Sequence, residues 1–243
     1  MRLHIVNPNT TASMTAKIAA AARATALSDT VVDARQPTMG PVSIEGFYDE
    51  AFAVPGMLGC IRKADRDGAD AHIIACFDDT GLDAARAIAQ APVIGIGEAA
   101  FHVASLIAAR FAVVTTLGVS IVPIEHNLKK YGLFERCARV RAAEVPVLAL
   151  EARNDEACAK ISGEIIAAIR DDRADAIVLG CAGMADLAAE LAALHGLPVV
   201  DGVAAAVTLA EGLVRLGLKT SRLGPYAVPR PKPYSGPFSP FQP

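Results

Sequence analysis

The sequence contains no tryptophan, and phenylalanine and tyrosine bring its aromatic content to only 5%. Because apolar residues still make up 53% of the 243 positions, aliphatic side chains and alanine must build the core. The chain also lacks the low hydrophobicity and high net charge of a disordered protein, since its formal net charge is −3. Without a basic excess it offers no cationic face that would displace counterions from phosphates, which argues against nucleic acid as a partner.

Export signals and long apolar runs are also missing. The sequence begins MRLHIVNPNT, whereas a secretory signal needs an apolar run of about 7–15 residues after its charged start. The most apolar stretch, from Val103, is interrupted by Arg110 before it reaches the roughly 18 residues of a membrane span. We therefore expect a cytoplasmic protein with no membrane partner and with reduced thiols.

The cysteines lack the spacing of a metal site. None of the five forms a CxxC or CxxH pair, and the five histidines do not cluster at ligand spacing, so we expect no metal. The five are Cys60, Cys76, Cys137, Cys158 and Cys181. A single cysteine in such a chain is most often a small buried apolar residue.

Short apolar runs alternate with alanine-rich helical patterns, which is typical of βαβ units and a mainly parallel sheet. The expected strands are Leu3–Asn7, His72–Cys76, Val93–Ile96, Phe111–Thr115, Val145–Leu150, Ala176–Gly180 and Val199–Asp201. The expected helices are Met14–Ala24, Glu98–Arg110, Asp155–Arg170, Asp186–Leu194 and Val203–Leu216. The pattern predicts an α/β fold.

Three segments recur in the same order about 105–108 residues apart, which indicates a duplication. The clearest pair is HIIACFD from His72 and IVLGCAG from Ile177. We expect one half over residues 1–97, completed by the helix near 205–217, and a second over 98–204. Residues 225–243 hold seven of the fifteen prolines and form a separate tail, which either drapes over the surface or stays partly disordered.

In each half one cysteine, Cys76 or Cys181, ends a strand and precedes a loop that leads into a helix. Ligands bind at the carboxyl ends of parallel strands, so the duplication would face the two thiols across a cleft. Backbone N–H groups of Phe77–Asp78 and Ala182–Gly183 would lower the thiol pKa from about 8.5. One thiolate could then remove a proton while the other thiol delivers one to the opposite face. Core packing preserved by duplication is the alternative, and the other three cysteines lack this context.

Several stretches also carry a family resemblance. They are NPNTT from Asn7, SIEG from Ser43, HIIACFDD from His72, VTTL from Val114 and IVLGCAGM from Ile177. With these motifs, the chain resembles the hydantoin and allantoin racemases of the aspartate/glutamate racemase superfamily over nearly its whole length. The resemblance implies two pseudo-symmetric flavodoxin-like domains with parallel sheets and an active site in the cleft between them. It also implies cofactor-independent racemisation by Cys76 and Cys181, and a homo-oligomer.

The residues after each cysteine bear on the substrate. The superfamily's amino-acid racemases usually have Asn-Thr and Thr-His there, where this chain has Phe77-Asp78 and Ala182-Gly183. A cyclic ureide fits these positions better than a free amino acid. The stretches CFDDTG and IGIGEAA look closer to the allantoin type, which would place the reaction in purine catabolism, with a 5-monosubstituted hydantoin as the alternative. A superfamily decarboxylase or cis–trans isomerase, and more distantly a non-catalytic ligand-binding module, remain open.

Removing a proton beside a ring carbonyl gives an enolate, whose oxygen needs hydrogen-bond donors. The hydroxyl of Thr115 or Thr116 could supply one, and Asn9 could hold a ring carbonyl unless its amide serves the turn. Ser43 and Tyr48 lie in a polar stretch that could reach over the cleft or stay at the surface. Asp78 and Asp79 follow the first cysteine of the pair, and each could contact substrate or cap the next helix. No metal, flavin or pyridoxal phosphate is required for this chemistry.

Overall fold

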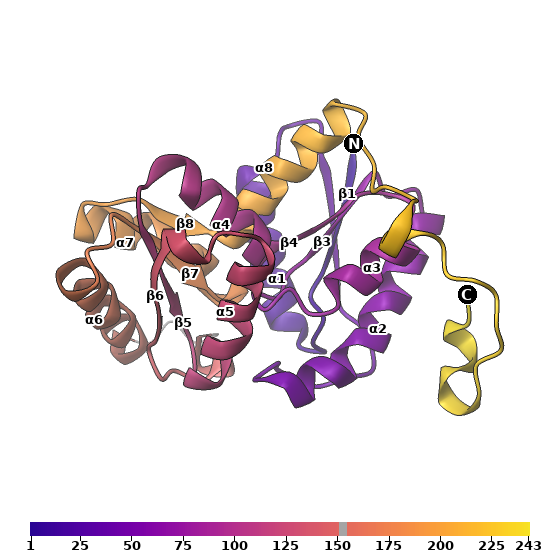
Figure 1. Ribbon diagram of the computed structural model, residues 1–243, viewed down its shortest axis with the longest axis horizontal. Helices are drawn as coiled ribbons and strands as arrows, with labels where there is room; N and C mark the ends of the chain where they lie inside the picture. The colour runs from indigo at the N-terminus through magenta and orange to yellow at the C-terminus, as the bar shows by residue number, and fades with distance from the viewer. Residues whose placement is uncertain (151–154) are drawn as a thin grey trace.

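The structure, a computed structural model, describes residues 1–150 and 155–243 and shows two α/β halves side by side (Figure 1). The chain begins with β1 (Arg2–Val6), α1 (Ala12–Thr25), β2 (Val31–Arg35), α2 (Phe47–Arg66), β3 (Ala71–Ile74), α3 (Leu82–Ile88), β4 (Val93–Gly95) and α4 (Ile96–Ile107). It continues through β5 (Phe111–Thr115), α5 (Ile121–Lys130), β6 (Cys137–Ala142), α6 (Asp155–Asp171), β7 (Ala176–Gly180), α7 (Ala188–His195), β8 (Val199–Asp201) and α8 (Gly202–Arg215).

The two halves have the same topology. One sheet has the strand order β2-β1-β3-β4 and the other β6-β5-β7-β8, and every neighbouring pair is parallel. This is the doubly wound order of a flavodoxin-like sheet, so the prediction of two pseudo-symmetric parallel α/β halves is confirmed. The inner strands β3, β5 and β7 are buried along their whole length, which explains why they read as continuous apolar runs.

The halves share a core through two helices. Helix α8 contacts α1, α4 and strands of both sheets, and α4 also packs on β7. Phe101 on α4 is fully buried, with its ring 5.3 Å from that of Phe77 and 6.0 Å from that of Phe111. Packing shared in this way fixes the carboxyl ends of one sheet relative to those of the other.

The strand predicted at Val145–Leu150 is wrong. Pro146 has no N–H for a sheet ladder, and Val147–Leu150 forms a 3₁₀ helix instead. The edge strand is β6, in which Val140 is the buried residue and arginines occupy positions 139 and 141. The sequence pattern also gave no prediction for β2, α2, α3 and α5. Strand β2 is another partly exposed edge, and α2 contains Pro55.

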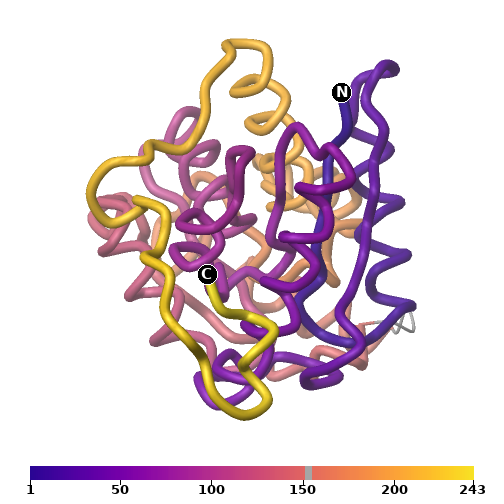
Figure 2. Tube along the Cα trace, turned by 90° about the vertical axis from the view of Figure 1, so that its right-hand side faces the viewer, coloured from indigo at the N-terminus to yellow at the C-terminus, as the bar shows by residue number. Residues whose placement is uncertain are grey.

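The proline-rich tail runs along the surface of the first half (Figure 2). The Tyr226 hydroxyl donates to the carboxylate of Asp83 on α3 at 2.8 Å, and Arg62 on α2 donates to the Gln242 carbonyl at 3.0 Å. The tail therefore drapes over α2 and α3. Within the described part of the chain, no helix has both the length and the apolar character that crossing a membrane requires.

Candidate active site

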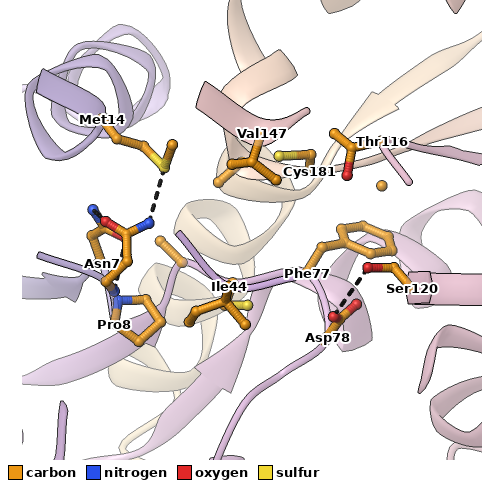
Figure 3. Close-up of a pocket in the computed structure, with 15 residues that line it drawn as sticks. Asn7, Pro8, Met14, Ile44, Phe77, Asp78, Thr116, Ser120, Val147 and Cys181 are labelled. Atoms are coloured by element: carbon orange, nitrogen blue, oxygen red, sulfur yellow. Dashed lines mark hydrogen bonds between the residues drawn. The ribbon is translucent and has the colours of Figure 1, made fainter. Parts of the chain in front are cut away.

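A cavity receives side chains from both halves, and its empty space, counted together with the part that opens to solvent, is about 420 Å³. Its walls include Asn7, Asn9, Met14, Ile44, Cys76, Phe77 and Asp78 from the first half and Thr116, Ser120, Val147, Gly180, Cys181 and Ala182 from the second. Figure 3 shows Cys181 and Thr116 facing the side formed by Ile44, Phe77 and Asp78. The cavity thus brings the two strand-end cysteines together.

The two thiols are held in matching ways. The N–H of Asp78 donates to the sulfur of Cys76, and the N–H of Gly183 donates to that of Cys181 at 3.4 Å, in each case from the residue two positions further on. From the residues that the structure describes, Cys76 alone of the two also accepts a hydrogen bond from a hydroxyl, that of Thr80, at 3.2 Å. The duplication therefore preserves the thiol and its amide donor, while the first half adds a second donor.

The predicted lowering of the thiol pKa is wrong for the protein without a ligand. Protein atoms surround both sulfurs, and this desolvation raises the pKa of Cys181 to about 11 and that of Cys76 further still. The negative charge of Asp78 adds to both shifts, whereas the amide donors act against them. Both thiols are therefore neutral in the free protein at neutral pH.

The substrate residues predicted from sequence separate into two groups. Asn9, Phe77, Asp78, Thr116 and Ala182 line the cavity, whereas Ser43, Tyr48, Thr115 and Gly183 do not. The Thr115 hydroxyl is fully buried and donates to the Gly180 carbonyl at 3.0 Å, so it is not available to a ligand. Of the two threonines, Thr116 is the one that lines the cavity. Gly183 contributes through its N–H to Cys181 and lines an adjoining space.

The stretch from Ser43 to Tyr48 is divided between a loop and a helix. Ser43 is half-buried, and its neighbour Ile44 lines the cavity in its place. Tyr48 lies on α2, is 78% exposed and packs against Phe52. Of the two alternatives left open by the sequence, the structure favours the surface for Tyr48, because the chain enters α2 at Phe47, and neither side chain lines the cavity.

Asn9 is held by its neighbours in a way that leaves a donor available. Asn7 donates to the Asn9 side-chain oxygen at 2.8 Å, and the backbone N–H of Thr11 donates to the same oxygen at 3.0 Å. The Asn9 amide nitrogen donates to the Met14 sulfur at 3.2 Å. Because a thioether is a weak acceptor, a carbonyl oxygen of a bound ligand would be a better partner for this nitrogen.

Two of the cavity residues missed from sequence are Ser120 and Val147. The Ser120 hydroxyl donates to Oδ2 of Asp78 at 3.4 Å, across the boundary between the halves (Figure 3). The repeat carried a signal for Ser120, because β5 is equivalent to β1 and the loop after β1 contains Asn9. No such signal marked Val147, because the stretch Val145–Leu150 was predicted to be a strand and forms a 3₁₀ helix from Val147 instead.

The adjacent carboxyl groups of Asp78 and Asp79 have different surroundings. Burial, followed by the charges of Glu50 and Asp79, raises the pKa of Asp78 to about 7. Asp79 turns away from the cavity and accepts the N–H groups of Gly97 and Glu98 at the start of α4. Burial likewise raises its pKa to about 7. Asp79 is thus a helix cap, and Asp78 is available to a ligand.

The other cysteines lie outside the cavity: Cys60 on α2, Cys137 at the start of β6 and Cys158 on α6. In residues 1–150 and 155–243, no group of three or more histidine, cysteine or acidic side chains is arranged to hold a metal ion.

Fold and site together define a duplicated α/β protein whose two halves contribute one thiol each to a shared cavity. The family model described as Asp/Glu/Hydantoin racemase matches residues 3–210. A hydantoin racemase of Rhizobium meliloti is 49% identical over 236 residues, which cover 97% of this chain and 98% of that protein. The chain belongs to the Asp/Glu/Hydantoin racemase family.

Two further relatives show that the similarity extends to racemases named for two different substrates. A hydantoin racemase of Pseudomonas sp. (strain NS671) is 43% identical, over 99% of this chain and 97% of that protein. The solved structure of an allantoin racemase from Klebsiella pneumoniae is 48% identical with a TM-score of 0.97, and the match covers 100% of this chain and 99% of that one.

Proposed function

We propose that the protein interconverts the enantiomers of a cyclic ureide, allantoin or a 5-monosubstituted hydantoin, by two-base proton transfer between Cys76 and Cys181 without a cofactor. The observation that carries this proposal is the pair of thiols that line one cavity from equivalent strand ends, each with an amide donor two residues on. Duplication supplies one acid–base group for each face of a bound ring.

In the reaction, one cysteine acts as thiolate and takes the hydrogen from ring carbon 5, so that a C–H bond breaks and an S–H bond forms. The electron pair moves onto the neighbouring carbonyl oxygen, where neutral donors such as Thr116 and Asn9 can stabilise the enolate. The opposite thiol then gives its proton to the other face and becomes the thiolate. A thiol of high pKa is rarely ionised but is a strong base once it is, which suits a weakly acidic C–H.

The character of the cavity favours a neutral ring over an amino acid. No arginine, lysine or histidine is among the described residues that line it, so nothing there pairs with a free carboxylate. Amide and hydroxyl groups line it instead, and these match ring N–H and C=O groups. The chain is 49% identical to a hydantoin racemase and 48% identical to an allantoin racemase. The proposal therefore includes both allantoin, with its ureido group on carbon 5, and hydantoins with another substituent there.

The test is a parallel polarimetric assay of allantoin and an alkyl hydantoin in deuterated water. We expect the optical rotation of at least one to decay while deuterium enters carbon 5. Retention of rotation and of the C–H signal in both compounds would overturn the proposal. A maleate or arylmalonate substrate converted in the same assay series would favour an isomerase or decarboxylase instead. The predicted homo-oligomer can be tested separately by light scattering.

A further inference from the structure

Asp78 is the one carboxyl group among the described residues that line the cavity, and no cationic side chain among them neutralises it. The residue is 9% exposed. Its carboxylate accepts one long hydrogen bond, from the Ser120 hydroxyl at 3.4 Å. Its backbone is held at both ends, because its N–H donates to Cys76 and its carbonyl accepts from Asn127 at 2.7 Å. A fixed backbone with a weakly satisfied side chain leaves the carboxyl group free to meet a ligand.

The groups around Asp78 favour its neutral form. Burial comes first, and Glu50 on α2 and Asp79 in the same loop add negative charge; together they raise the pKa of Asp78 to about 7, while Ser120 acts weakly against them. Glu50 is itself short of partners, since its Oε1 is buried and accepts no hydrogen bond from any described residue. The thiols of Cys76 and Cys181 bring no positive charge. A neutral ring that closes the cavity would add to the desolvation.

We propose that Asp78 acts as a neutral carboxylic acid that pairs with the cis-amide edge of the ring. Its carbonyl oxygen accepts the ring N–H, and its hydroxyl donates to the ring carbonyl beside the reacting carbon. This inference rests on the proposed function and names the group that selects the substrate class. A carboxylic acid carries one donor and one acceptor side by side, the complement of a lactam –NH–C(=O)– unit, which a free α-amino acid lacks.

The same contact has a catalytic consequence. As the ring loses its C–H proton to a thiolate, negative charge grows on the carbonyl oxygen that faces the Asp78 hydroxyl. The hydrogen bond then strengthens in the transition state while the proton stays on Asp78. In the second half Gly183 stands two residues after its cysteine, where Asp78 stands in the first, so this donor comes from one side only.

Two variants separate this role from that of a charged carboxylate. Asp78→Asn keeps a donor and an acceptor on a neutral group of the same shape, and we expect kcat within about tenfold of the unchanged protein. Asp78→Leu keeps only the size, and we expect kcat to fall about 100-fold or more. Equal losses of kcat in both variants would show that a carboxylate is required. A fully active Asp78→Leu would show that residue 78 needs no hydrogen bond to the ring. Either result overturns the inference.

Binding of 5,5-dimethylhydantoin, which has no hydrogen on carbon 5 and cannot react, gives a second readout by calorimetry. Between about pH 5.5 and about pH 8 we expect Kd to rise roughly tenfold in the unchanged protein as Asp78 ionises, and to stay level in Asp78→Asn. A pH dependence that survives in Asp78→Asn overturns the inference. If the ring binds with the expected pH dependence but no ring racemises, the proposed function fails while the role of Asp78 in recognition stands.

Discussion

The two halves cap the helix that follows their fourth strand in different ways. In the second half, Asp201 ends β8 and accepts the N–H groups of Val203 and Ala204 at the start of α8. In the first half the equivalent residue is Gly95, and the carboxylate that caps α4 comes from Asp79, in the loop after β3. A side chain on Gly95 would collide with it, because a Cβ there would lie 2.0 Å from Oδ1 of Asp79.

This exchange of caps explains why the surroundings of the two cysteines differ. The loop after Cys76 carries Asp78, Asp79 and Thr80, whereas the matching three positions after Cys181 are the small or apolar residues 183–185. Duplication has kept the strands and the thiols with their amide donors, while the acidic groups have collected on one side. The cavity is thus symmetric in its thiols and asymmetric in charge, which fits the proposed recognition of a ring with two different edges.

The largest effect is expected from loss of the symmetric pair. Cys76→Ser and Cys181→Ser should each lower the racemisation rate by about 1000-fold or more, because an alcohol is a far weaker acid than a thiol and one face loses its proton carrier. Deuterium should still enter one enantiomer of the substrate in each variant, and the opposite one in the two cases. Polarimetry and proton NMR measure both effects.

Cys158→Ser is the control for this experiment, because Cys158 is half-buried on α6 outside the cavity. We expect its rate to match that of the unchanged protein. A loss as large as that in Cys181→Ser would show that the assignment of the pair is wrong.

Exchanging the caps should change stability rather than chemistry. Gly95→Asp alone should lower the free energy of unfolding by about 3 kcal/mol or more, because two buried carboxylates would occupy one space. Adding Asp79→Gly should recover most of the loss, since the three atoms nearest to the new Cβ all belong to the Asp79 side chain. The left-handed backbone of Asp79, with φ of 50°, also suits glycine. Urea denaturation measures this cycle, and a double variant no more stable than Gly95→Asp would contradict it.

Asp78 should make stability depend on pH in a way that its counterpart Gly183 cannot. Because the folded protein raises the pKa of Asp78 from 3.8 to about 7, the neutral form stabilises the fold fully below about pH 4. That contribution is lost as the pH rises through 7. Asp78→Asn removes the titration. At about 1.4 kcal/mol per pKa unit, its stability relative to the unchanged protein should be about 4 kcal/mol higher at pH 8 than at pH 4. Thermal unfolding at the two pH values tests the sign.

The sequence predicted those parts of this comparison that repeat locally. Buried strands such as β3 and β7 were apparent from their apolar runs, and Cys76 and Cys181 from their place at the strand ends. The edge strand β6 was missed because its arginines break the apolar pattern. Asp79 was left between capping the next helix and touching substrate, because its partners Gly97 and Glu98 lie in a later helix. The predicted direction of the thiol pKa shift was wrong because burial of both sulfurs depends on how the two halves pack together, which the local sequence does not show.

The smallest effect, and the finest test of the asymmetry, comes from Thr80, whose hydroxyl donates to Cys76 and lowers its pKa. Thr80→Val keeps the shape and removes the donor, so Cys76 ionises less readily. We expect kcat/KM to fall about threefold to tenfold, with its rise at alkaline pH displaced upward.

The fall in kcat/KM must be the same for both enantiomers, because the ratio of their kcat/KM values equals the equilibrium constant of a racemisation, which is unity. The difference between the thiols should appear instead in deuterium exchange without inversion, which should slow at the face that Cys76 serves. Equal slowing at both faces would mean that Thr80 acts on the fold of the loop and not on one thiol.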